Sequence, residues 1–109
     1  MKKILKVNYT TKTDETSKLV WYFIEGVKMN WVDSMKFAKE NELRLLTPEE
    51  IQDSIKTLFI PKNESFWTSQ GNNRFALFYN HSYNGIVNHF QDYLLSIVCC
   101  EEMKQGIEL

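Results

Sequence analysis

Two histidines and an aspartate in the last third of the chain are the side chains best suited to acid–base or metal chemistry. His81, His89 and Asp92 lie among Asn- and Ser-rich segments, and imidazole with carboxylate can pass a proton or bind a metal ion. The chain has no third histidine, and spacing alone does not make these groups converge. We therefore expect exposed loop histidines, with no catalytic residue, no metal and no cofactor. A small enzyme that uses the three residues is the alternative.

The two cysteines, Cys99 and Cys100, are adjacent in an apolar run. Neighbouring residues on a strand point to opposite faces, so a disulfide between them would need a strained turn. We expect two free thiols, one facing the core and the other on the opposite face. A redox switch is the alternative.

The segment 80–92 combines amide, imidazole and tyrosine side chains around an Asn-Gly dipeptide. Such a mixture suits adaptable hydrogen bonding around aromatic anchors. The candidate binding residues are Arg74, His81, Tyr83, Asn84 and His89. An ordinary solvated hairpin explains the same residues, so both interpretations stay open.

Length and composition indicate one globular domain over residues 1–109. The formal net charge of −1 gives no electrostatic case for nucleic acid or for an anionic membrane. No apolar run is long enough to span a bilayer, and Lys6 and Asn8 interrupt the N-terminal run before it could serve as an export signal. We therefore expect a cytoplasmic protein.

The first half of the chain has two helical patterns. Asn30 can cap a helix over Trp31–Glu42, whose predicted apolar stripe is Trp31, Met35 and Ala38, widened by Val32 and Phe37. In the second pattern, Thr47-Pro48-Glu49-Glu50 supplies a cap residue, a proline at the first helical position and a capping-box glutamate. The apolar face of that helix is Ile51, Ile55 and Leu58, and Pro61 ends it.

β-prone runs surround these helices. Leu19–Ile24 is continuously apolar, which is typical of a strand buried on both faces, and Glu25-Gly26 should close it with a turn. Asn84-Gly85 predicts a two-residue hairpin. The other predicted strands are Ile4–Tyr9, Phe66–Ser69, Arg74–Tyr79, Ile86–Phe90 and Tyr93–Cys100, with a loop over 10–18 and a flexible tail over 101–109. Helices among antiparallel strands make an α+β domain.

The order of several short motifs resembles a bacterial and phage family of unknown function with a C-type-lectin-like fold. Relatives of that family are the C-terminal domain of a collagen-like bacterial adhesin and, distantly, the formylglycine-generating enzymes. The matching residues are Lys18-Leu-Val-Trp21, Trp31 with Ser34, Arg44, Leu45, Thr47, Glu50, Trp67-Thr-Ser and Cys99, with Leu46 in place of the usual proline. The resemblance implies two helices packed on an antiparallel sheet. It also implies that Arg44 holds the turn between the helices, although an anion-binding role is the alternative. Trp31 and Trp67 are expected in the core.

Departures from the family pattern carry information as well. Many members place a cysteine in the first helix that can bridge to the last strand, and here that position is Ala38. The bridge is therefore absent, which agrees with a reducing compartment. The separated catalytic cysteines of the formylglycine-generating enzymes are missing too, as are the Glu-Pro-Asn and Trp-Asn-Asp calcium motifs of sugar-binding lectins.

Together these features favour a non-enzymatic, calcium-independent binding module whose partner is a protein. One concrete version is a phage or mobile-element protein that docks on a host or defence protein. An adhesin-type domain that binds an extracellular polymer or glycan is the first alternative, and the small enzyme is the second.

Calcium should leave the stability of the protein unchanged. The sequence lacks the clustered carboxylates that a hard cation needs, and a ligand stabilises only the state that binds it. We expect the same melting temperature in excess calcium and in chelator. A difference of several degrees between the two conditions would contradict the expectation.

Overall fold

The computed structural model describes residues 6–56 and 64–103. Within these ranges the chain forms a seven-stranded sheet and two helices. In chain order the elements are β1 (Tyr9–Asp14), β2 (Leu19–Met29), α1 (Trp31–Glu40), β3 (Arg44–Leu45), α2 (Pro48–Lys56), β4 (Phe66–Gly71), β5 (Phe75–Asn80), β6 (Gly85–Phe90) and β7 (Leu95–Glu102). No helix in the described part of the chain is long and apolar enough to cross a membrane.

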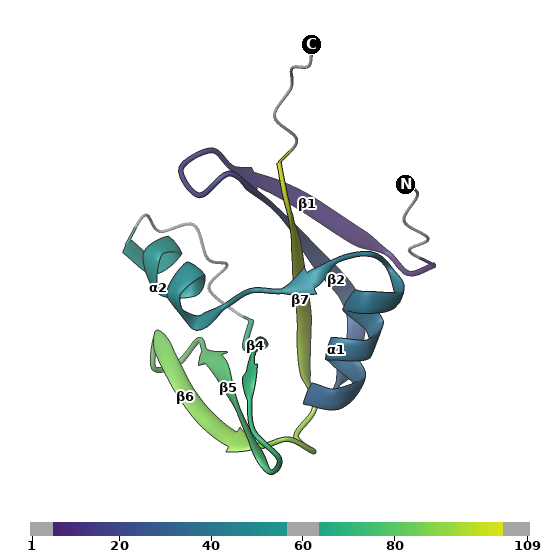
Figure 1. Cartoon of the computed structure of the whole chain (residues 1–109), viewed down its shortest axis with the longest axis vertical. Coiled ribbons are helices and arrows are strands. Elements are labelled where there is room, and N and C mark those ends of the chain that lie inside the picture. Colours follow the sequence, from purple (N-terminus) through teal and green to yellow (C-terminus); the bar gives the residue numbers. More distant parts are fainter. Residues whose placement is uncertain (1–5, 57–63, 104–109) are drawn as a thin grey trace.

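The sheet has the strand order β1-β2-β7-β4-β5-β6, with β3 pairing separately with β7 (Figure 1). The strand pairings in the described part of the chain are antiparallel except the one between β4 and β7, which is parallel. The predicted architecture, two helices on a mainly antiparallel sheet, is confirmed.

Each face of the sheet carries its own hydrophobic core, because successive residues of β7 point to opposite faces. Ile97 and Cys99 belong to the core beneath α1, whereas Val98 and Cys100 belong to the core beneath α2. The apolar run Leu19–Ile24 of β2 lies beside β7 and contributes side chains to both cores. This confirms the prediction of a strand buried on both faces.

Local polar chemistry fixes the start of α1. The Asn30 side chain accepts a hydrogen bond of 2.8 Å from the Asp33 N–H, as predicted for the cap. The helix ends at Glu40, two residues before the predicted end, because Glu42 has a φ of 60° and leaves the helical conformation. Met35 and Ala38 face the core as expected, but Val32 is 56% exposed and does not widen the stripe.

The edge of the sheet at β1 differs from the prediction. Tyr9–Asp14 is a strand where a loop was expected over 10–18, and Lys6 to Asn8 lie outside it. Thr10, Thr11 and Thr13 are β-branched residues that suit a strand, and their exposure on an edge hides the hydrophobic alternation used for prediction. The strand pairs with β2 over its full length.

β2 also runs further than predicted. The expected turn at Glu25-Gly26 is instead a bulge, after which the strand continues to Met29. Gly26 has a φ of +75°, a conformation that glycine adopts without steric cost. The break in register lies between Ile24 and Lys28.

The β5–β6 hairpin has a longer loop than the predicted two residues. Asn80 pairs with Gly85, so His81 to Asn84 form a four-residue loop. Asn84 takes the left-handed conformation with a φ of 57°, and its N–H donates to the Asn80 carbonyl over 2.7 Å. Asn84 therefore ends the loop, where we had placed the first residue of a tighter turn.

The last strand is shifted relative to the prediction. β7 spans Leu95–Glu102, so Tyr93 and Leu94 precede it and the two glutamates that were assigned to the tail belong to it. Glu102 pairs with Leu19 of β2. Leu58, Pro61 and residues 104–109 lie outside the described residues.

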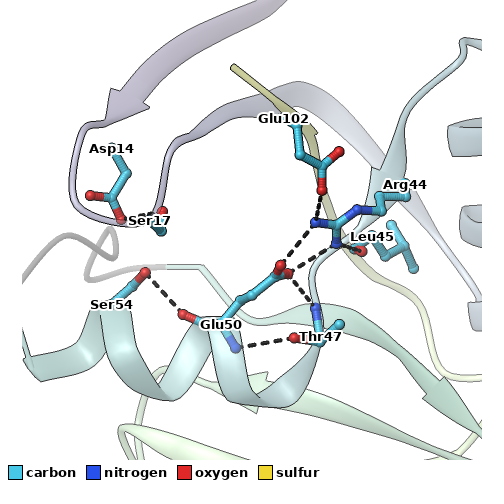
Figure 2. A network of polar contacts seen from close by, with 8 residues as sticks. All are labelled: Asp14, Ser17, Arg44, Leu45, Thr47, Glu50, Ser54 and Glu102. Atoms are coloured by element: carbon cyan, nitrogen blue, oxygen red, sulfur yellow. Dashed lines mark hydrogen bonds and ion pairs between the residues drawn. The ribbon is translucent and has the colours of Figure 1, made fainter. Parts of the chain in front are cut away.

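Arg44 joins three elements through its guanidinium group (Figure 2). Its two terminal nitrogens donate to the two carboxylate oxygens of Glu50 over 3.0 and 2.8 Å, and one of them also reaches Glu102 over 2.7 Å. β3, the first turn of α2 and the end of β7 are thereby tied together. The predicted role of Arg44 in holding the turn between the helices is confirmed. Its guanidinium is already paired with the carboxylates of Glu50 and Glu102, which argues against the alternative of an external anion site.

The capping box at α2 shares a residue with this network. The Thr47 N–H donates to Glu50 over 2.9 Å, and the Glu50 N–H donates to the Thr47 hydroxyl over 3.1 Å. Burial alone would raise the pKa of Glu50, but the hydrogen bonds from Arg44 and Thr47 outweigh it and hold that pKa below its usual range. Glu50 thus remains an anion that links the helix cap to the cation.

Replacing Thr47 with alanine should lower the free energy of unfolding by about 1 kcal/mol, because the first turn of α2 loses its cap. Equilibrium denaturation measures the change. Gln52→Ala, on the exposed side of the same helix, is the control and should change the value by less than about 0.5 kcal/mol. Equal effects of the two substitutions would mean that the cap contributes nothing.

Glu50→Gln should destabilise the protein at neutral pH and lose most of its effect in acid. The pKa of Glu50 is lowered on folding, so its contribution is complete above the reference value of 4.5 and disappears as the pH falls through the folded-state pKa. The free energies of unfolding of both proteins, measured across this range, should converge at low pH. Glu49→Gln, which removes an exposed carboxylate from the same turn, should show a smaller difference at neutral pH.

Candidate functional site

An open groove with a volume of about 1160 Å³ lies where the two halves of the sheet separate. β4 and β7 meet through one pair, Phe66 with Ser96, next to the start of β7. β2 and β7 line the groove on one side of this bridge. Glu64 and Ser65, which precede β4, and the β5–β6 hairpin line it on the other. The groove is therefore a consequence of how the strands diverge.

His81 lies in this groove and fastens the hairpin loop to the start of β4. Its Nδ1 is 3.0 Å from the Ser65 hydroxyl, and its backbone N–H donates to the same oxygen over 3.1 Å. Its Nε2 is 3.4 Å from the Ser82 hydroxyl. A serine activated for catalysis needs an imidazole whose second nitrogen is held by a carboxylate, and here that nitrogen faces a hydroxyl. The arrangement therefore fits a loop contact better than a nucleophile and its base.

His89 lines the groove from β6 and contacts aromatic rings. Its ring centroid lies 4.3 Å from that of Tyr93 and 6.2 Å from that of Phe78. Within the described ranges no group of three or more His, Cys, Asp and Glu side chains could hold a metal ion. The sequence-based set of His81, His89 and Asp92 is thus not assembled into a metal site.

The other candidate residues lie apart from the groove. Tyr83 is 70% exposed in the hairpin loop, and the Asn84 side chain accepts a hydrogen bond of 2.7 Å from the Tyr79 hydroxyl. Arg74 lies at the opposite end of the hairpin, with its guanidinium carbon 5.9 Å from the centre of the Phe75 ring. The five residues named from the sequence therefore do not form one patch, and the groove brings together only His81 and His89.

Two exposed residues at the groove escaped the sequence analysis. Tyr93 and Leu94 are 51% and 60% exposed, yet they were assigned to the buried last strand. Asp92 and Tyr93 belong to a turn between β6 and β7, so the strand begins after them. A polar Gln91-Asp92 pair in front of the apolar run was the available signal for a turn.

Charged and polar side chains surround these apolar residues. Glu25 and Lys28 line the groove from the β2 bulge, and Glu64 accepts a hydrogen bond from the Ser96 hydroxyl. The groove is thus an apolar and aromatic surface bordered by charges of both signs. An apolar surface with a polar border resembles the surfaces through which proteins contact partners, and its mixed charges do not favour ions of one sign.

The two cysteines do not line the groove. Cys99 lies in the core beneath α1 and Cys100 in the core beneath α2. Cys99 and Cys100 are free and fully buried on opposite faces of β7, as predicted. Burial raises the pKa of each thiol to about 12. Since the thiolate is the reactive form, this arrangement gives no support to the redox switch. Ala38 lies in the same core as Cys99, as expected for the position that carries the bridging cysteine in the resembled family.

Comparisons with known proteins bear on the fold. No protein-family profile matches the chain, and no curated protein matches it. Among solved structures, the carbohydrate-recognition domain of the mouse scavenger receptor C-type lectin superimposes with a TM-score of 0.59 at 13% identity, covering 94% of this chain and 100% of that one. The chain has a C-type-lectin-like fold. At this identity the likeness shows the fold alone, and it confirms the predicted fold class.

Proposed function

We propose that this protein is a non-enzymatic binding module and that it recognises a protein partner through the groove at the split of the sheet. The observation that carries the proposal is the pair of exposed apolar residues, Tyr93 and Leu94, beside the two groove histidines. Exposed apolar side chains that adjoin one another and are bordered by polar residues are the kind of surface that partners use. They become buried when a partner binds.

A protein partner fits this groove because its chemistry is mixed. Tyr93 and Leu94 provide apolar anchors, the His89 imidazole provides a hydrogen-bonding group, and the charged border provides orientation. Interfaces between proteins concentrate their energy in such aromatic anchors, with polar groups around them. The partner would insert an apolar side chain beside Tyr93 and place polar groups over the border.

Tyr83 is a second contact on the same hairpin. It lies in the loop adjacent to His81, and its ring is mostly free to touch a partner. Arg74 and Asn84 belong to the candidate set chosen from the sequence, but their positions outside the groove make them peripheral to this proposal. The binding surface is therefore centred on the groove and extends to the hairpin loop.

A glycan-binding, adhesin-type role is the second candidate. The observation in its favour is that the solved neighbour is described as a carbohydrate-recognition domain. A tyrosine ring such as that of Tyr93 can pack against the apolar face of a sugar. Against it stands the missing Glu-Pro-Asn or Trp-Asn-Asp motif in the sequence, so the sugar would have to bind without calcium.

The cellular setting belongs to the same proposal. The family resemblance, together with the free cysteines, supports a phage or mobile-element protein that acts in the cytoplasm. Its partner there would be a host or defence protein.

Binding should depend on the groove residues. The immobilised chain is used to capture partners from a bacterial lysate, and each captured protein is then purified and titrated against variants. The double variant Tyr93→Ala/Leu94→Ala should weaken binding at least tenfold, or about 1.4 kcal/mol, because it removes both anchors. Tyr83→Ala should have a smaller effect.

The matched control is the double variant Gln52→Ala/Asp53→Ala on the exposed face of α2, which should leave binding unchanged. Melting temperatures show whether each variant is folded. If binding depends on α2 and not on the groove, the proposed site is wrong. If the chain captures no protein but binds a glycan array, the second candidate replaces the first.

A further inference from the structure

β6 is an edge strand of the sheet that the described residues form. It ends the strand order of the sheet and pairs only with β5 among the described residues, and Figure 1 shows it at the outer border of the molecule. An edge strand leaves a row of backbone donors and acceptors open to another strand. These groups can therefore form hydrogen bonds with a strand from another chain.

The devices that usually block strand pairing are absent from β6. Gly85–Phe90 contains no charged residue and no proline, and its register with β5 is continuous from Phe75 to Asn80 without a bulge. The opposite edge, β1, carries Lys12 and Asp14. Charges, prolines and bulges are the means by which proteins prevent edge strands from pairing with other chains. The β6 edge should therefore pair with another strand more easily than the β1 edge.

The backbone groups that point outward can be assigned from one hydrogen bond. The Gln91 N–H donates to the Arg74 carbonyl over 3.2 Å, so Gln91 faces β5. Every second residue of an antiparallel strand faces the same partner, and the residues between them face away. Ile86 and Asn88 therefore direct their backbone groups away from β5, and so does the N–H of Phe90. The Phe90 carbonyl also points away from β5 but already accepts from the Tyr93 N–H over 3.4 Å.

We propose that β6 pairs with β6 of a second copy of this chain, antiparallel, about a two-fold axis at Asn88. In this register Asn88 lies opposite Asn88 of the second copy, and Ile86 lies opposite Phe90 of the second copy. The two Asn88 residues can then exchange both of their backbone hydrogen bonds. The Ile86 N–H meets the Phe90 carbonyl, whose second lone pair can accept beside the bond from Tyr93. The two sheets join into one continuous sheet.

The side chains are compatible with this symmetric register. A residue on the two-fold axis meets its own copy, so a charge at the centre of the strand would meet a like charge. The centre of β6 is a neutral asparagine, and two asparagine amides can bond to each other. Ile86 and Phe90 form aromatic–aliphatic cross-strand pairs on one face, and Val87 and His89 do so on the other, which favours pairing. The strand is thus complementary to its own reversed copy.

The test is the molecular mass in solution. Sedimentation equilibrium over a wide concentration range should show the mass rising from 13.0 kDa toward twice that value. Asn88→Lys places like charges against each other at the axis and should weaken dimerisation at least tenfold. Because Asn88 is exposed, the melting temperature of the monomer should be unchanged.

Two further variants make the test specific. Thr11→Lys places the same charge on the exposed opposite edge, in β1, and should dimerise like the natural chain. A mixture of Asn88→Lys and Asn88→Glu chains should form a mixed dimer, since opposite charges then meet at the axis. A chain that stays at 13.0 kDa at every concentration overturns the proposal, even if β6 takes a strand from another protein. A dimer that tolerates Asn88→Lys also overturns it.

Discussion

The fold depends on β7, a strand that is buried on both faces and paired on both edges. Its alternating residues build the two cores, so one short apolar run supports α1 on one side and α2 on the other. Along one edge it pairs with β2, and along the other it pairs with β3 at Cys99 and Cys100 and with β4 at Ser96. A polar side chain at any fully buried position of this strand would lose its hydrogen bonds to water inside one of the cores, which would destabilise the fold. That constraint explains why small and apolar residues fill Ile97 to Cys100.

The same strand also determines where the groove can form. β3 and β4 pair with the same edge of β7 at different positions along it. β3 pairs near the end of the strand, and β4 pairs through one residue near its start. The hairpin that follows β4 is therefore free to diverge, and side chains from both halves of the sheet line the space between them. The groove follows from the topology. Core residues such as Phe78 and Ile97 form part of its lining, and exposed residues such as Tyr93 and Leu94 form another part.

Sequence patterns predicted the parts of this fold that local chemistry controls. The Asn30 cap and the Thr47–Glu50 capping box depend on hydrogen bonds between residues that are close in the chain, and both formed as expected. The run Leu19–Ile24 revealed a strand covered on both faces because burial leaves a plain hydrophobic signal. β1 and the extension of β2 were missed because an exposed edge and a bulge give no such alternation. The groove was missed for a different reason: only His81 and His89 of the five candidates line it, since its residues come from segments far apart in the chain.

The residues that hold the fold together differ from those of the proposed binding surface. The two cores and the Arg44–Glu50–Glu102 network hold the strands and helices in place. Tyr93 and Leu94, by contrast, are more than half exposed and belong to a turn and the position after it. Exposed side chains contribute little to folding, so these positions can change identity without loss of the scaffold. If the proposed surface binds a partner, its residues can change with that partner, whereas the buried residues of β7 cannot.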